Sequence, residues 1–229
     1  MKRLSFLVIA IVISVTTSCK KENTDTGFSQ DIKDLVPSEA MNAMRQNGMT
    51  IYEGMKPPQI EGIYLSSEHI LFGSSDKDDK IGERYADYRY QFFDQDFTDL
   101  SVKTSYNGYR VDDGVLIDQA SGLGSFISGN GNFFSVFSEE HGETSSGAKY
   151  TWLAIYSGEI TKDGIKNLVN SFYMKDKEDP YNKLVDIGTV RVFKDKDGVS
   201  ETKGSLRISA EDKQDFANKI FSAKGMGER

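Results

Sequence analysis

The chain has very few of the residues that most often bind metals or carry covalent catalysis. Its 229 residues include one cysteine, Cys19, and two histidines, His69 and His141. With no cysteine after position 19, disulfides within the body of the chain, thiolate metal sites and thiol catalysis are excluded. Neither histidine belongs to an HExxH motif or another metal-ligand spacing. We therefore predict no metal site, no cofactor and no catalytic residue.

The sequence also lacks a block of basic residues. It has 28 lysines and arginines against 35 aspartates and glutamates, for a formal charge of −7 at pH 7. Nucleic-acid binding depends on clustered positive charge that can neutralise phosphates. A nucleic-acid partner is therefore not expected.

The longest apolar run, over residues 4–15, is too short to cross a membrane as a helix. About 12 residues at roughly 1.5 Å each span ~18 Å, well below the ~30 Å of a hydrocarbon core. The run follows Lys2 and Arg3 and precedes small residues at positions 16–18. This layout is typical of an export signal, which we place at residues 1–18.

Small residues followed by Cys19 resemble the lipobox of bacterial lipoproteins, although Thr16 stands where that motif usually has leucine. The resemblance implies cleavage before Cys19, a lipid on its sulfur and attachment to a membrane of the cell envelope. Lys20 in place of aspartate after the cysteine favours the outer membrane. Residues 19–30 then form the lipidated cysteine and a polar tether, and residues 31–229 form a single β-rich domain.

Two helices are predicted, one near each end of this domain. Pro37 can open the first helix, over residues 37–47, and Gly48 is placed to end it. Ser209 can cap the second helix, over residues 210–223.

Between the helices, apolar residues recur with the period of two that is typical of strands. Residues 165–175 fit either a helix or a strand, and we favour a returning strand. Tight turns separate the runs because Asn-Gly and Asp-Gly supply the positive φ that hairpins need. These turns are expected at 73–79, Asn107-Gly108, Asp113-Gly114, Asn130-Gly131, Asp163-Gly164 and Asp197-Gly198. The pattern predicts a mainly β fold, an antiparallel meander that closes into a barrel or folds into a sandwich.

One predicted strand is apolar on both faces. Trp152, Ala154 and Tyr156 share one face, while Leu153 and Ile155 share the other. We expect one of these faces to line the interior and the other to be covered by a helix.

Three segments resemble parts of uncharacterised Gram-negative surface lipoproteins that carry a lipocalin-like domain. They are residues 57–64 (PPQIEGIY), 127–133 (ISGNGNF) and 157–165, and the similarity extends over roughly residues 31–208. The resemblance implies a lipocalin-like β-barrel and a small ligand, but it transfers no ligand-binding residue. Tyr64 stands where true lipocalins have the tryptophan of a Gly-x-Trp motif.

Four aromatic residues are candidates for a ligand cavity at the barrel mouth: Tyr88, Tyr90, Trp152 and Tyr156. The alternative is that they fill the core, because an eight-stranded barrel is just wide enough for either outcome. Our preferred hypothesis is a non-enzymatic binding module for a small apolar or glycan-like ligand. A structural protein that docks onto another envelope protein is the first alternative, and an envelope hydrolase is the least supported.

The remaining polar motifs predict loops rather than chemistry. Adjacent acids at 112–113 and 139–140 are interpreted as solvated loop residues. Ser125 and Ser128 do not form the GxSxG of a nucleophile elbow. Residues 195–201 do not match the spacing of a calcium loop and favour a hairpin turn, as do residues 76–79.

Overall fold

The computed structural model describes residues 27–67 and 69–203, which form two helices and eleven strands. Cys19, the export signal and the predicted helix over residues 210–223 lie outside the described residues. The helices are α1 (Gln30–Leu35) and α2 (Ser38–Gln46). The strands are β1 (Met55–Lys56), β2 (Gly62–Ser66), β3 (His69–Ser74), β4 (Asp87–Asp96), β5 (Ser101–Tyr109), β6 (Leu116–Asn130), β7 (Phe133–Thr144), β8 (Lys149–Thr161), β9 (Gly164–Glu178), β10 (Val190–Asp195) and β11 (Val199–Thr202).

Eight of the described strands form a hydrogen-bonded ring in the order β11-β2-β4-β5-β6-β7-β8-β9. The ring is completed by β9, which pairs with β11 through residues 164–166 and with β10 through residues 169–173. Strands β10 and β3 extend the sheet beyond that point. Strands β4 to β10 follow one another as antiparallel neighbours. The predicted mainly β meander is thus confirmed.

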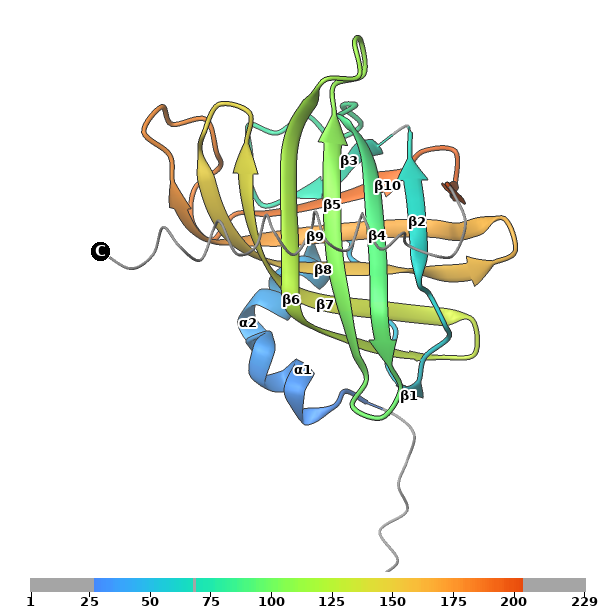
Figure 1. The fold of residues 1–229 in the computed structure, drawn as a ribbon. Helices are drawn as coiled ribbons and strands as arrows, with labels where there is room; N and C mark the ends of the chain where they lie inside the picture. The colour runs from blue at the N-terminus through green and yellow to red at the C-terminus, as the bar shows by residue number, and fades with distance from the viewer. Residues whose placement is uncertain (1–26, 68, 204–229) are drawn as a thin grey trace, which may run out of the picture.

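The strands are arranged in two layers that cross each other. In Figure 1, β4 and β5 run down the front of the molecule, while β8 and β9 run across it behind them. Buried side chains from both layers meet in between and form one cluster, which we call the aromatic core. Its large members include Tyr64, Tyr90, Phe92, Tyr106, Phe134, Tyr150, Tyr156 and Phe172.

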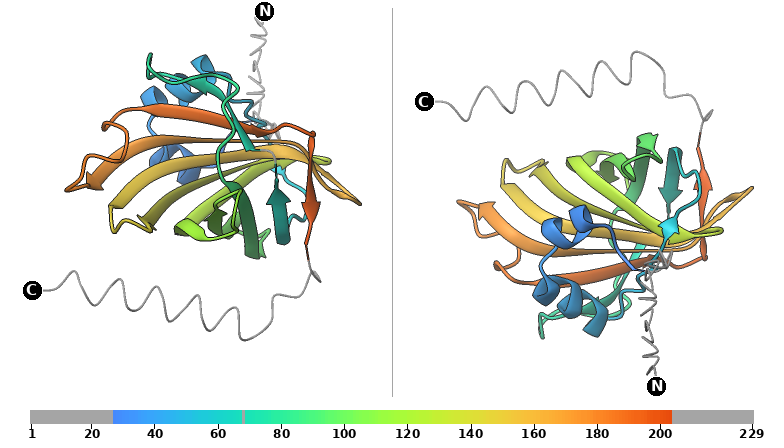
Figure 2. Two further views of the ribbon diagram at one scale, coloured as in Figure 1. Left: turned by 90° about the horizontal axis from the view of Figure 1, so that it is seen from above. Right: turned by 90° about the horizontal axis from the view of Figure 1, so that it is seen from below.

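Both described helices lie on the outer side of the β7–β10 layer (Figure 2). They enclose a second cluster, the helix-side core, whose members include Ile32, Val36, Met41, Met44, Phe137, Leu153, Ile155, Val190 and Val192. The helix predicted over residues 37–47 is confirmed as α2, and Gly48 follows its end with φ +98°. Helix α1 was not predicted, although Ser29 caps it by accepting a hydrogen bond from the Ile32 amide.

Strand β8 separates the two cores as its sequence predicts. Ala154 and Tyr156 are buried in the aromatic core, and Trp152 packs against it. Leu153 and Ile155 are buried in the helix-side core. The alternation along β8 therefore assigns each face of the sheet to a different core.

Residues 165–175 lie within β9, so the strand interpretation is confirmed. The turn predicted at Asn107-Gly108 is wrong, because both residues lie inside β5. Gly108 is needed there for packing, since a Cβ atom would lie 2.8 Å from the Tyr88 ring. The chain instead turns after β5 at Asp113-Gly114, where Gly114 has φ +68°.

Neither helix in the described part of the chain has the length and apolar character that crossing a bilayer requires.

Candidate ligand site

A cavity of about 140 Å³ opens within the aromatic core. Half of its lining residues are aromatic, and the lining comes from β3, β4, β5, β6, β8, β9 and β10 and from the β3–β4 and β9–β10 connections. The aromatic lining residues are His69, Tyr85, Tyr88, Tyr90, Tyr106, Trp152, Tyr156, Phe172 and Phe193. An engineered cavity of ~150 Å³ is large enough to bind benzene. The space therefore suits a ligand, or part of one, about the size of a single ring.

The structure brings all four predicted ligand residues to this cavity. Tyr88 and Tyr90 are two residues apart on β4, and their rings stack with centroids 5.9 Å apart. The Tyr90 ring meets the Tyr156 ring of β8 edge-on at 5.2 Å, and Trp152 stacks on Phe172 at 4.4 Å. These rings contact one another around the cavity and leave part of the interior open.

A carboxylate that the sequence analysis missed also lines the cavity. Asp118 of β6 accepts hydrogen bonds from the hydroxyls of Tyr106 at 2.9 Å and Tyr150 at 2.6 Å, and these two hydroxyls also contact each other. Burial raises the pKa of Asp118, and the two hydrogen bonds only partly oppose that effect. Asp118 shares a face of β6 with the buried Ala120, and the period of two along a strand is the signal that could have indicated its inward direction.

The prediction that Glu140 is a solvated loop acid is wrong. Strand β7 continues to Thr144, and Glu140 is 0% exposed on its inward face. Its carboxylate accepts hydrogen bonds from Thr104 Oγ1 at 2.8 Å, Trp152 Nε1 at 3.0 Å and the Tyr156 hydroxyl at 2.9 Å. All three donors are neutral, so burial raises the pKa of Glu140 despite them. Glu140 thus lies directly behind two rings of the cavity wall.

His69 is buried at the start of β3 and contributes to the cavity wall. Its Nδ1 is 3.0 Å from Ser66 Oγ, its Nε2 is 3.3 Å from the Tyr90 hydroxyl, and its ring stacks on Phe193 at 4.9 Å. Burial lowers the pKa of His69 to about 3. The residue is therefore neutral at pH 7 and serves as an aromatic wall with both ring nitrogens in hydrogen bonds.

His141 lies in a strand and has no part in the cavity. It is exposed on β7, away from the cavity lining, with Nδ1 3.0 Å from Thr151 Oγ1. Its Nε2 is 3.9 Å from Glu139. The two histidines thus have different environments, and only His69 borders the candidate site.

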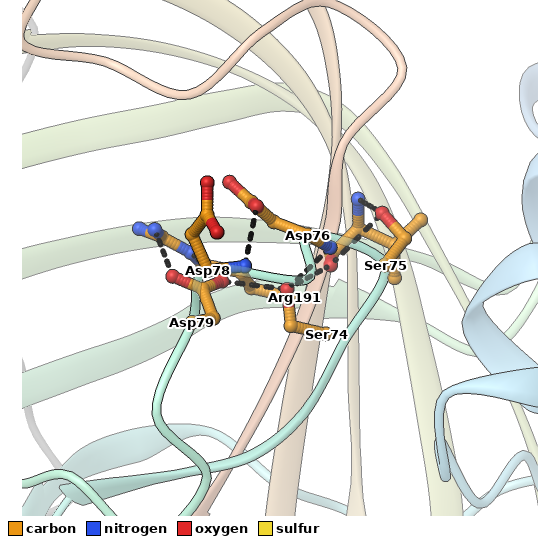
Figure 3. A network of polar contacts seen from close by, with 7 residues as sticks. Ser74, Ser75, Asp76, Asp78, Asp79 and Arg191 are labelled. Atoms are coloured by element: carbon orange, nitrogen blue, oxygen red, sulfur yellow. Dashed lines mark hydrogen bonds and ion pairs between the residues drawn. The ribbon is translucent and has the colours of Figure 1, made fainter.

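The rim of the cavity carries an ion pair between Arg191 of β10 and Asp79 of the β3–β4 connection (Figure 3). The guanidinium donates to both carboxylate oxygens, from Nε at 2.7 Å and Nη2 at 2.6 Å. It also lies 5.7 Å from the centroid of the Tyr85 ring. Burial alone would raise the pKa of Asp79, but hydrogen bonds from Arg191 and Ser74 outweigh it and lower that pKa. The predicted turn at 76–79 therefore also supplies a fixed counterion at the rim.

The loop between β9 and β10 lies at the cavity as well. It contributes Lys183, Leu184 and Val185 to the lining, and Lys183 is exposed. The Leu184 amide donates to Asp179 Oδ2 at 2.6 Å, and Lys177 Nζ donates to the Leu184 carbonyl at 3.2 Å. These bonds hold the loop against the ends of the strands.

The two serines considered in the sequence form hydrogen bonds with other protein groups and do not line the cavity. Ser125 Oγ donates to Ser138 Oγ at 2.8 Å, next to the Thr104 hydroxyl. Ser128 Oγ donates to the Gly54 carbonyl at 2.9 Å. The hairpin turn predicted within residues 195–201 is wrong, because β10 and β11 do not pair with each other. The chain bends at residues 196–198, and both strands pair with β9 at successive positions along it. Within residues 27–67 and 69–203, no group of three or more histidines and carboxylates is placed to hold a metal ion.

The comparisons with known proteins give no relative for this chain. No protein-family model matches it, no curated protein is significantly similar in sequence, and no solved structure is significantly similar in fold.

Proposed function

We propose that the chain is a lipid-anchored envelope protein whose lipocalin-like β ring binds one small ligand without chemically changing it. The observation that carries this proposal is the convergence of Tyr88, Tyr90, Trp152 and Tyr156 around an open space in the core. Protein interiors are normally packed with few voids larger than a water molecule. The cavity of about 140 Å³ departs from such packing and presents aromatic ring faces that a ligand can bury, which supports a binding site here.

The size of the cavity limits what it can hold. A long acyl chain does not fit inside ~140 Å³. A small apolar molecule or a single ring does, and a larger glycan-like ligand would have to extend past the β9–β10 loop. The proposal is thus for a ligand with a compact group that enters the aromatic core.

Hydrolysis has less support than binding. His69 and Asp118 share the cavity, but each already makes two hydrogen bonds to neighbouring side chains. A pKa of about 3 also makes His69 a weak base at neutral pH. We therefore assign these residues to the wall of a binding site.

Trp152 provides a direct test, because it is the only tryptophan in the chain and it lines the cavity. A molecule that enters the cavity should change its fluorescence. Native mass spectrometry of the domain from its host should show a retained mass that is released on unfolding. Ala154→Leu should fill the cavity and abolish both signals, with circular dichroism reporting that the β fold is kept. Undiminished binding by this variant would contradict the proposed site.

The anchor is tested separately. Seven residues lie between Cys19 and Gly27, where the described part of the chain begins, so a lipid on Cys19 would keep the domain within roughly 28 Å of the membrane. Cys19→Ala should abolish incorporation of labelled fatty acid and release the domain from membranes. Continued labelling of that variant would refute the lipid anchor without affecting the cavity proposal.

A further inference from the structure

Two carboxyl groups lie at or directly behind the wall of the cavity. Asp118 lines the space directly, and Glu140 lies immediately behind Trp152 and Tyr156. The Tyr106 hydroxyl donates a hydrogen bond to Asp118, while Trp152 and Tyr156 donate hydrogen bonds to Glu140. Donation to a carboxylate increases the electron density of an aromatic ring, and the ring face is already the negative end of its quadrupole. Three rings of the wall are polarised in this way.

The positive side chains of the lining are placed differently. The Arg191 guanidinium is paired with both oxygens of Asp79 and rests against Tyr85, so its charge is largely compensated at the rim. Lys183 is exposed on the β9–β10 loop. His69, the remaining base of the lining, is held neutral by burial. Apart from these bases, the lining combines ring faces with the carboxyl group of Asp118.

We propose that the ligand of this cavity is a small organic cation, a primary or quaternary ammonium whose charge lies between the ring faces and Asp118. The inference rests on the proposed function and specifies the chemistry of its ligand. An ammonium group near Trp and Tyr faces gains cation–π attraction, which grows when the group is desolvated. The ammonium would also pair with the Asp118 carboxylate, and a buried charge is costly unless it has an oppositely charged partner.

An anionic ligand would be repelled by the groups that attract an ammonium. Its charge would face Asp118 and the negative ring faces, with Glu140 behind them. A neutral apolar ligand would fit the rings and would leave Asp118 without a charge partner inside the cavity. The ammonium is the ligand class that satisfies both the rings and the carboxylate.

A pair of isosteric probes separates charge from shape. Choline and 3,3-dimethylbutan-1-ol have the same heavy-atom skeleton, and they differ in the replacement of the ammonium nitrogen by carbon. Titrations of the full-length protein in detergent, followed by Trp152 fluorescence and by calorimetry, give the affinity for each probe. We expect choline to bind at least about tenfold more tightly than the neutral isostere.

Asp118→Asn tests the role of the carboxylate, with Asp112→Asn as the matched control. Both changes remove one negative charge from the β5–β6 side of the molecule, but Asp112 is exposed. We expect the preference for choline to fall to less than about threefold in the Asp118 variant and to be unchanged in the Asp112 variant. Thermal unfolding of both variants reports whether the fold is retained, and the isosteric comparison on the unaltered protein needs no variant.

The outcomes distinguish the two proposals. Equal or tighter binding of the neutral isostere overturns the cation inference and leaves the proposed binding function standing. If neither probe binds and benzene, benzoate and benzylammonium also leave Trp152 fluorescence unchanged, the cavity is not a site for small rings and the proposed function fails with the inference. Preferential binding of choline that Asp112→Asn reduces as much as Asp118→Asn would show a general charge effect and would also overturn the inference.

Discussion

The two faces of β8 support two cores that are built on different principles. The helix-side core packs Leu153 and Ile155 against methionine and aliphatic side chains of α1 and α2. The aromatic core, one residue away along the same strand, contains a cavity, the carboxylates Asp118 and Glu140, and the imidazole of His69. Burying apolar surface stabilises a fold by about 25 cal/mol per Å², whereas burying a charge costs free energy unless it is paired.

This difference indicates that the two cores have different roles. The helix-side core contributes stability, and it offsets the cost of keeping polar groups and open space in the aromatic core. Functional sites commonly depart from the close packing and the pairing of buried polar groups that the rest of a fold shows. Three matched pairs of substitutions test this division, each comparing a buried residue with an exposed counterpart.

The largest effect is expected for Phe137→Ala in the helix-side core. Phe137 is fully buried and meets Phe28 edge-on at 5.2 Å. Removal of a buried phenylalanine ring leaves a cavity and should lower the free energy of unfolding by about 3–5 kcal/mol, measured by urea denaturation. Phe133→Ala on the same strand is the control. Phe133 is 42% exposed, so a loss below ~1 kcal/mol is expected. Similar losses in the two variants would contradict the assignment of stability to this core.

Glu140→Ala should have the next largest effect, and it probes the aromatic core. The change leaves the donors of Thr104, Trp152 and Tyr156 without their acceptor. Buried donors that lose a charged partner cost free energy, and we expect the free energy of unfolding to fall by roughly 3 kcal/mol. Trp152 fluorescence should also shift, because its indole N–H loses the carboxylate. Ligand affinity should fall in parallel, unlike in Phe137→Ala.

Glu139→Ala is the control for that change. Glu139 is adjacent in sequence, but its side chain is 29% exposed and pairs with Lys175 on the surface. Exposed ion pairs contribute about 0–1 kcal/mol, so little change is expected in stability and none in Trp152 fluorescence. Equal changes in stability and fluorescence for the two variants would mean that the buried hydrogen bonds of Glu140 do not contribute to stability.

The contrast between these two glutamates also marks where sequence reasoning succeeds and fails. The alternation of Trp152, Leu153, Ala154 and Ile155 was sufficient to predict both faces of β8 and their cover, because burial imposes the period of a strand. The same alternation continues from Phe134 through Val136 and Ser138 to Glu140. A charged pair was instead interpreted as a loop, since charged side chains are rarely buried.

Other features depend on contacts that a sequence pattern does not encode. Asn107-Gly108 has turn chemistry, but Gly108 is required by the nearby Tyr88 ring, which is far away in sequence. The inward direction of Tyr88, Tyr90 and Trp152 follows from periodicity. Whether the rings fill the interior or leave about 140 Å³ open depends on how they pack against residues from seven strands. The candidate residues were therefore predictable, and the cavity itself was not.

The smallest effect is expected from the protonation of His69, and it appears as a pH dependence. The pKa of His69 is about 3 in the folded protein and about 6.5 in an unfolded chain, because burial disfavours the charged imidazolium. As pH falls below about 6.5, the unfolded state takes up a proton that the folded state does not. The free energy of unfolding should therefore fall by up to about 1.4 kcal/mol per pH unit between pH 6 and 4.

The raised pKa values of Glu140, Asp118 and Asp195 act in the opposite direction, since the folded state then binds protons more readily than the unfolded state as pH falls. The contribution of His69 is isolated by subtracting the profile of His69→Gln from that of the unaltered protein, measured by urea denaturation at each pH. The difference should grow as pH falls from 6 to 4. His141→Gln, which removes an exposed histidine outside the aromatic core, is measured alongside as the matched control. A parallel profile for His69→Gln would mean that this imidazole is hydrated and exchanges protons freely, which would contradict its place in the wall of the aromatic cavity.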